Sequence, residues 1–127
     1  MVWVLDSSAV GFLAQRSAAA TEMLAMMHRR GLWPPRVPTP VLVECLTGQV
    51  GRDVVANRLL RSCVIEAAPS ESLARQAAVL RTRACRGSAV DAIVVAAAEP
   101  DGVVLTSDLG DLGALAASSR GVRIVRV

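Results

Sequence analysis

The chain has 127 residues, enough for one domain with a substantial core, and 53% of them are hydrophobic, which argues against disorder. Its net charge of +3 is the balance of 14 basic residues, all of them arginine, and 11 acidic residues, so contacts with nucleic-acid phosphates are permitted but not required. The only aromatic residues are Trp3, Phe12 and Trp33, which argues against an RNA-binding module that stacks bases on aromatic side chains.

The N-terminal half is expected to begin with an apolar strand over residues 2–5, followed by a short helix that Ser7 or Ser8 caps. The methionine-rich segment 19–31 has helical spacing, and it ends in His28, two arginines and a glycine, which is typical of a helix C-terminus. The methionines fit either the core or, together with Phe12, a surface for a partner protein.

The prolines of segment 32–38 favour extended chain. Thr39 is expected to cap the next helix, with Pro40 at its first position and its end near Gly48. A further helix is expected over about residues 51–62.

The C-terminal half continues the alternation of strands and helices. The expected elements are a strand (63–68), a helix opened by Pro69 and Ser70, a buried helix (88–99), a turn (99–102), a buried strand (103–106), a helix (107–117) and a closing strand (122–127). This order predicts right-handed crossovers and an α/β fold. We therefore expect one domain over residues 1–127, a three-layer α/β/α sandwich with a small, mostly parallel central sheet.

The three cysteines, Cys45, Cys63 and Cys85, form no C-x-x-C pair, so we expect small buried thiols in a reducing compartment. The N-terminus lacks the basic region of a signal peptide. The charge-free run 92–98 is far shorter than the roughly 20 residues of a membrane span. We expect a cytoplasmic protein with no membrane contact.

Most of the eleven acidic residues have a structural explanation, as members of first helical turns (Glu22, Glu71), of a turn (Asp101) or of solvated surface (Asp53, Glu66, Glu99). Asp6 and Asp108 instead follow strands directly, and parallel strands end at the same edge of a sheet, where ligands bind. Glu44 lies among apolar residues of its helix, where an unpaired acid is expensive. Asp91 opens the most apolar helix, and Asp111 follows Asp108 by one helical turn.

Helix capping is an alternative explanation for two of these acids, since Asp91 fits a capping box with Ser88 and Asp108 fits an N-cap. Capping does not explain why several acids would gather at one edge, because two carboxylates 4 Å apart repel by about 4 kcal/mol at an effective dielectric constant of about 20. Either some stay protonated or a cation neutralises them, and the chain has no lysine. A hard divalent cation, Mg²⁺ or Mn²⁺, on a basic protein points to phosphodiester hydrolysis by metal-activated water.

Four segments resemble the PIN-domain nucleases, and more narrowly the VapC-type toxin ribonucleases of bacterial toxin–antitoxin pairs. LDSSAV (5–10) is similar to their opening Asp motif, VPTPVLVECLTG (37–48) to their Glu segment, SAVDAIVVAAA (88–98) to the next Asp segment, and VVLTSDLGDLGAL (103–115) to the closing T-x-D-x-x-D motif. The match covers nearly the whole chain in the right order. One departure is Leu112, where the family often has an aromatic residue.

The resemblance implies an endoribonuclease that holds Mg²⁺ or Mn²⁺ with Asp6, Glu44, Asp91 and Asp108, and uses Asp111 as an auxiliary acid. It also implies a homodimer and inhibition by a small cognate VapB-type antitoxin.

Three arginines just before the Asp91 helix, Arg81, Arg83 and Arg86, either contact RNA phosphates beside the metal or simply face solvent.

Other functions fit less well. A haloacid-dehalogenase-like phosphatase needs an Asp where Ser8 stands, and a response-regulator receiver needs a lysine. A Ser–His–Asp hydrolase would depend on His28, the sole histidine, which fits a helix C-terminus better. No Gly-rich nucleotide-binding motif is present. The remaining alternative is a catalytically silent PIN-like domain that binds RNA or a protein.

Overall fold

The computed structural model of the chain describes residues 1–67 and 69–127. In these residues five strands form one sheet in which every pair is parallel, in the order β3-β2-β1-β4-β5. The strands are β1 (Trp3–Leu5), β2 (Arg36–Pro38), β3 (Val64–Glu66), β4 (Val103–Thr106) and β5 (Arg123–Arg126). The helices are α1 (Ser7–Ala14), α2 (Ala18–Arg29), α3 (Thr39–Cys45), α4 (Val50–Leu60), α5 (Glu71–Ala84), α6 (Ala89–Ala98) and α7 (Asp111–Ala117).

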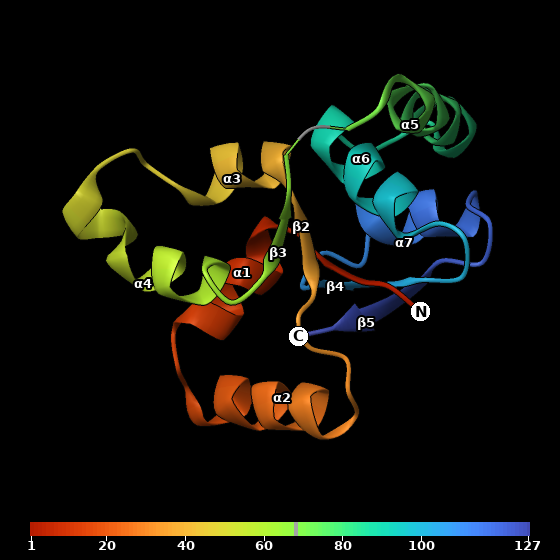
Figure 1. The fold of residues 1–127 in the computed structure, drawn as a ribbon. Helices are drawn as coiled ribbons and strands as arrows, with labels where there is room; N and C mark the ends of the chain where they lie inside the picture. Colours follow the sequence, from red (N-terminus) through yellow and green to blue (C-terminus); the bar gives the residue numbers. More distant parts are fainter. Residues whose placement is uncertain (68) are drawn as a thin grey trace.

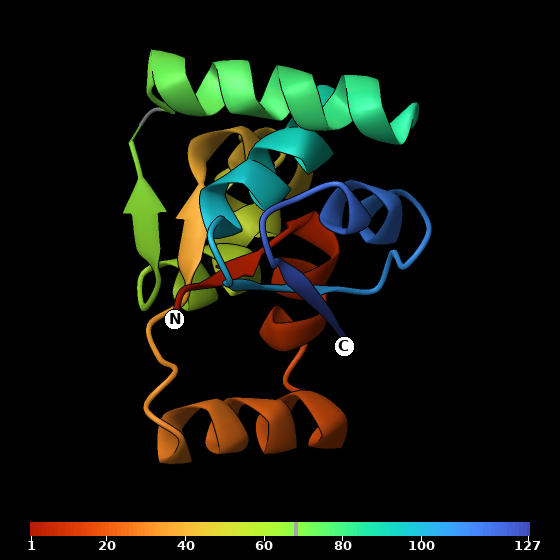
Figure 2. The ribbon, with the colours of Figure 1, turned by 90° about the vertical axis from the view of Figure 1, so that its right-hand side faces the viewer.

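The strand order explains which helices cover which face of the sheet. From β1 the chain steps outward to β2 and β3, and then it returns past β1 to reach β4 and β5. Right-handed crossovers in opposite directions place their helices on opposite faces. Helices α1, α2 and α4 accordingly pack together on one side, and α5, α6 and α7 on the other (Figures 1 and 2). The predicted α/β/α sandwich is confirmed.

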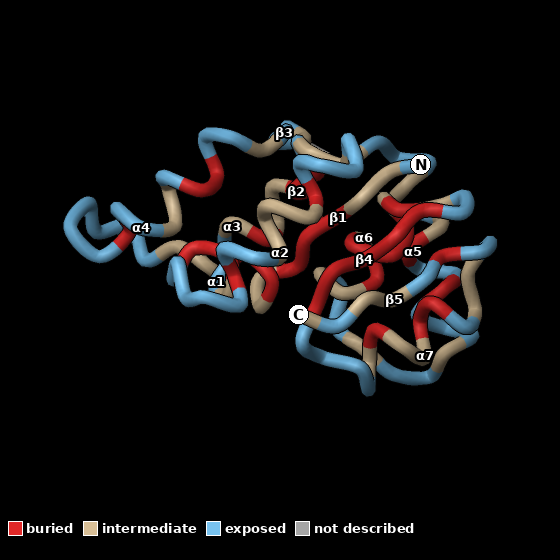
Figure 3. The backbone as a smooth tube through the Cα atoms, turned by 90° about the horizontal axis from the view of Figure 1, so that it is seen from below, coloured by how far each residue is buried: buried red, intermediate tan, exposed pale blue. Residues whose placement is uncertain are grey.

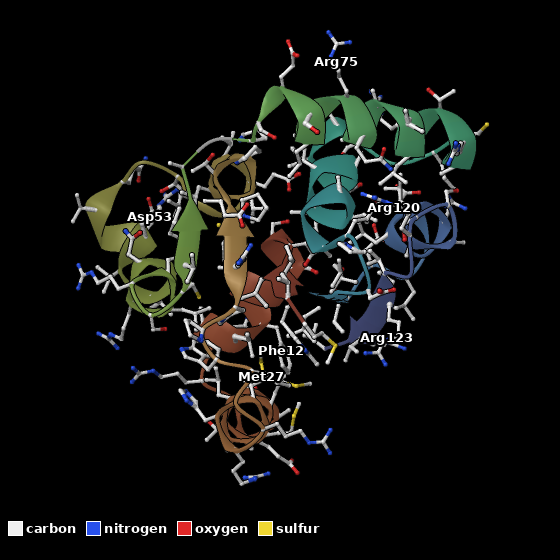
Figure 4. All side chains as sticks on the ribbon, turned by 45° about the vertical axis from the view of Figure 1, so that its right-hand side comes forward. Phe12, Met27, Asp53, Arg75, Arg120 and Arg123 are labelled. Atoms are coloured by element: carbon white, nitrogen blue, oxygen red, sulfur yellow. The ribbon has the colours of Figure 1, made fainter. Side chains whose placement is uncertain are left out.

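The core lies where β1 and β4 run through the middle of the sheet (Figure 3). All four residues of β4 are buried, and α6 buries five of its ten residues, which matches the apolar helix expected from the sequence. In α2, Met27 is fully buried, and Phe12 of α1 is a half-buried neighbour of the same core (Figure 4). The methionine pattern therefore reflects packing, at least at Met27.

The expected boundaries are correct to within a few residues at most elements, but three local predictions are wrong. Asp6, not Ser7 or Ser8, caps α1, because its carboxylate accepts the amide of Ala9. Helix α3 begins at Thr39 itself, whose hydroxyl donates to the Ala67 carbonyl instead of capping. The last helix begins at Asp111 and not at residue 107, because a turn follows β4. The final residue of the strand expected over 63–68 lies outside the described residues.

Candidate metal centre

The site lies where the chain changes direction in the sheet. Strands β1 and β4 are neighbours, but the connections that leave them run to opposite sides, and ligands bind at such switch points beyond the carboxyl ends of parallel strands. Asp6 directly follows β1, and Thr106 is the last residue of β4. The Thr106 hydroxyl donates to Asp6 Oδ2 over 2.5 Å and accepts the amide of Asp108 over 2.9 Å. This hydroxyl ties the two strand ends to the turn that carries Asp108.

Asp6 is buried, with 6% of its surface exposed, and its hydrogen bonds are nearly complete. Oδ1 accepts the Ser8 hydroxyl at 2.7 Å and the Ala9 amide at 2.9 Å, while Oδ2 accepts the Thr106 hydroxyl. A carboxylate offers about four lone-pair positions, so one position on Oδ2 remains. Asp6 is therefore mainly a structural acceptor with limited capacity for a further ligand.

Three other carboxylates form an open cluster, called here the acid trio: Asp91, Asp108 and Asp111. Each offers an oxygen atom, and these atoms lie within 4.8 Å of one another; among the described residues this is the one such group of three or more acids, cysteines or histidines. Asp91 comes from the first turn of α6, Asp108 from the turn after β4, and Asp111 from the first residue of α7. None of the three side chains is buried. The trio can hold a metal ion.

The local hydrogen bonds of the trio leave part of each carboxylate unused. Asp91 Oδ2 accepts the amide of Ser88 in a capping box, as the sequence alternative anticipated. Asp108 Oδ1 accepts the amides of Gly110 and Asp111, at 3.0 and 3.4 Å. Over residues 1–67 and 69–127, the second oxygen of each trio member accepts no hydrogen bond. Capping and metal binding are thus compatible, because each uses a different oxygen.

An arginine partly neutralises the trio. Arg86 Nε donates to Asp111 Oδ1 over 2.7 Å, so the absence of lysine does not by itself require a metal to balance these acids. Three carboxylates against one guanidinium still leave two formal negative charges in excess. A divalent cation with oxygen ligands matches both that charge and the chemistry of the donors.

Gly87 lets the segment between α5 and α6 approach α7. Its φ angle of +94° is one that side-chain-bearing residues rarely adopt, and a Cβ added there would lie 2.7 Å from Leu115 Cδ1. This close approach sets Arg86 and the start of α6 beside the first turn of α7, where the trio assembles.

Glu44 does not join the trio. It is exposed on the seven-residue helix α3, and its neighbour Val43 is 82% exposed, so the expected cost of an acid in an apolar environment does not arise. Apolar neighbours in sequence were misleading, because so short a helix covers the core with little more than Val41.

The prediction that Asp53 and Glu99 are exposed to solvent is wrong. Asp53 is buried and accepts the Thr47 amide, the Thr47 hydroxyl and the Gly48 amide, each over 2.9 Å (Figure 4). These hydrogen bonds, led by the Thr47 amide, lower the pKa of Asp53 against the opposing effect of desolvation. The Glu99 side chain is 1% exposed and pairs with Arg120 over 2.9 Å. The prediction that Glu22 lies in the first turn of its helix is also wrong, because α2 begins at Ala18 and has no acid in its first turn.

The three candidate RNA-binding arginines have different surroundings. Arg86 pairs with Asp111, and Arg81 Nε donates to the Gly87 carbonyl over 3.1 Å. Arg83 is exposed and faces an open hollow on α5. Arg86 is therefore the one of the three that contacts the acid trio directly.

Thr106, Ser8 and the Arg86–Asp111 pair were not anticipated as parts of the site. The sequence did contain a signal for Thr106: it is the one polar residue of an apolar strand, and it stands at the end that lies at the carboxyl edge of the sheet, where ligands bind. No signal indicated the Arg86–Asp111 pair, whose members are 25 residues apart.

The other reactive side chains lie outside the site. Of the free cysteines Cys85 is exposed, contrary to expectation, whereas burial raises the pKa of Cys63 to about 11. Burial likewise raises the pKa of Cys45. His28 lies in the last turn of α2, as expected, and stacks on Trp33 with 5.0 Å between ring centroids.

The chain matches no protein-family model and no curated protein. Within the described part of the chain, no helix combines the length and apolar character needed to cross a bilayer.

Proposed function

We propose that this protein is a metal-dependent endoribonuclease of the PIN-domain type, which hydrolyses RNA phosphodiester bonds at the acid trio. The observation that carries the proposal is the convergence of Asp91, Asp108 and Asp111 within 4.8 Å at the switch point of a parallel sheet. The capping box explains Asp91, turn hydrogen bonds explain Asp108, and the Arg86 pair explains Asp111. None of these explains why the three carboxylates lie together, which costs electrostatic energy without a cation. The four-segment resemblance to VapC-type toxins supports the same proposal independently.

In this proposal Mg²⁺ or Mn²⁺ is the cation. Bound to the free trio oxygens, it would lower the pKa of a water molecule and screen the negative charge of the scissile phosphodiester. Asp6 remains a further candidate donor through its last lone pair on Oδ2, and it holds the Thr106 hydroxyl that fixes the Asp108 turn. Glu44 remains a candidate on the resemblance alone.

The chain's own residues have separate tasks. The Ser88 amide fixes Asp91, and the Gly110 amide fixes Asp108, so the carboxylates are held before any ion arrives. Arg86, which balances Asp111 in the free protein, is well placed in charge and position to contact a phosphate of the substrate. Preorganised carboxylates bind a cation without first losing side-chain entropy.

The biological setting follows from the resemblance: the toxin of a type II toxin–antitoxin pair, cytoplasmic, homodimeric and inhibited by a VapB-type antitoxin. Size-exclusion chromatography tests the homodimer, and copurification with a small bound protein tests the antitoxin.

Cleavage of a mixed RNA pool by the purified protein tests the proposed activity, in Mg²⁺, in Mn²⁺ and in EDTA. We expect discrete cleavage that requires metal and disappears in Asp108→Asn. The matched control is Asp101→Asn, which removes one negative charge from an exposed turn outside the trio. Equal cleavage by Asp108→Asn would refute the trio as the active site.

A catalytically silent PIN-like domain that binds RNA or protein is the second candidate. The observation that favours this second candidate is the capping role of Asp91, which gives that residue a structural function without metal. Metal-dependent RNA binding by the wild type without any cleavage product would support it.

A further inference from the structure

A group of arginines lines a hollow on α5. An open hollow of about 760 Å³ is lined by Arg75, Val79 and Arg83 of α5 and by Arg120 from the α7–β5 connection, with Glu71, Ser72 and Gln76 completing it. Residues 75, 79 and 83 are spaced by four, so they form one stripe along the helix. In Figure 4 Arg75 points outward from α5, and Arg120 lies below this helix.

The stripe leads toward the acid trio because α5 and α6 are antiparallel. Gln76, early in α5, contacts Glu99 at the end of α6, whereas Arg81, late in α5, contacts Gly87 just before α6 begins. The C-terminal end of α5 therefore lies beside Asp91, and Arg86 bridges onward to Asp111. From Arg75 to Arg83 the helix rises about 12 Å, at about 1.5 Å per residue.

The arginines of the hollow differ in how they are held. Arg120 is fixed by the buried Glu99 carboxylate, which accepts both its Nε and its backbone amide, and its two terminal nitrogens donate no hydrogen bond to the described residues. Arg75 pairs with Glu71 at 3.5 Å, with both side chains more than three-quarters exposed, and such a pair is worth little. Arg83 forms no ion pair within the described residues. These guanidinium groups are available to an anionic ligand.

The chemistry of the hollow favours a nucleic-acid backbone. Guanidinium groups bind phosphate oxygens through planar paired donors. None of the residues lining the hollow is aromatic, so it offers no platform for base stacking. Arg75 and Arg83, about two turns apart on α5, together with Arg120 fit several phosphates of one strand better than one small anion.

We propose that this hollow binds the phosphate backbone of a single-stranded RNA, at nucleotides adjoining the bond that is cut at the acid trio. The proposal rests on the proposed nuclease function for its link to cleavage. It assigns Arg83, Arg120 and Arg75 as contacts to phosphates, and it assigns Arg81 no such role because its Nε is committed to the Gly87 carbonyl. Recognition at this surface is independent of base identity.

Binding of a fluorescently labelled 2′-O-methyl RNA, which resists hydrolysis, tests the proposal by anisotropy in EDTA over a range of salt concentrations. We expect Arg83→Gln to weaken binding by about fivefold at low salt, the upper range for one exposed ion pair. The slope of log K against log salt should fall by about 0.7 for each lost phosphate contact. Oligo(U) and oligo(A) should bind alike.

The matched control is Arg29→Gln, an exposed arginine on α2, which lies across the sheet from α5 (Figure 2). An unchanged affinity for this variant, with reduced affinity for Arg83→Gln and Arg120→Gln, supports the hollow. Equal affinities for all variants, or no binding by the wild type, would overturn the proposal. Stronger binding of poly-glutamate than of RNA would also overturn it, in favour of an acidic protein partner.

Cleavage assays on an ordinary RNA separate this proposal from the nuclease itself. We expect Arg83→Gln to raise KM with little change in kcat, since it removes binding away from the reacting bond. Loss of binding in the hollow variants without any wild-type cleavage would leave the hollow standing and refute the nuclease. Metal-dependent cleavage by the wild type, with an unchanged KM in Arg83→Gln, would support the nuclease and refute the hollow as an RNA-binding surface.

Discussion

Asp6 and Asp53 differ from the acid trio in how their oxygens are used, although all five are aspartates. The carboxylates of Asp6 and Asp53 are buried, and each accepts three hydrogen bonds from nearby amides and hydroxyls. Each trio carboxylate is exposed or half-buried and uses one oxygen for local structure, leaving the other without a donor in the described chain. The number of donors around a carboxylate, more than its place after a strand, therefore distinguishes a structural acid from a candidate metal ligand.

The largest expected effect is on metal binding by the trio. Asp91→Asn and Asp108→Asn should each weaken Mn²⁺ binding at least about 100-fold, because loss of even an outer hydrogen-bond partner costs metal sites about 10- to 100-fold. Asp6→Asn should weaken it less. Isothermal titration without RNA measures all three variants. A larger loss in Asp6→Asn than in Asp108→Asn would reverse the comparison and make Asp6 the principal ligand.

The structural side of the comparison predicts a loss of stability at Asp6. Asp6→Ala removes the α1 cap and leaves the Thr106 hydroxyl without its acceptor, which should cost about 2 kcal/mol or more of unfolding free energy. Asp6→Asn retains an acceptor oxygen and should cost less. Urea denaturation without metal measures both. A stability unchanged in Asp6→Ala would show that the hydrogen bonds of Asp6 are not structural.

A smaller effect is expected from Arg86. Because it balances Asp111 in the metal-free protein, Arg86→Gln should tighten Mn²⁺ binding by about two- to fivefold, the range for an exposed ion pair. Arg81→Gln is the control, since Arg81 contacts the Gly87 carbonyl and forms no ion pair in the described part of the chain. Weaker or unchanged Mn²⁺ binding in Arg86→Gln would mean that the guanidinium does not compete with the ion.

The smallest effect is a pH dependence at Asp53. Its pKa is lower in the folded than in the unfolded chain, so its stabilising contribution is complete above the unfolded value of about 3.9 and is lost as pH falls through the folded pKa. Asp53→Asn should therefore be less stable than wild type near neutral pH, with the difference shrinking below about pH 4. Thermal unfolding from pH 7 to pH 3 measures this. A difference that grows as pH falls would contradict it.

The sequence alone predicted the fold well, since apolar strands alternated with helices and the crossover rule left few topologies. It also indicated that Asp6 and Asp108 follow strands and that Asp91 opens the buried helix. These are local properties, encoded by residues close together in the chain. They are also the properties that the structure retains.

Tertiary structure decided which acids meet and how each is satisfied. It brought Asp111 into the trio and left Glu44 exposed outside it, because a seven-residue helix buries little of its surface. It buried Glu99 beneath Arg120 and paired Arg86 with Asp111, contacts between residues 21 and 25 positions apart. Burial and charge pairing depend on distances across the folded chain, and the order of residues along the sequence does not contain those distances.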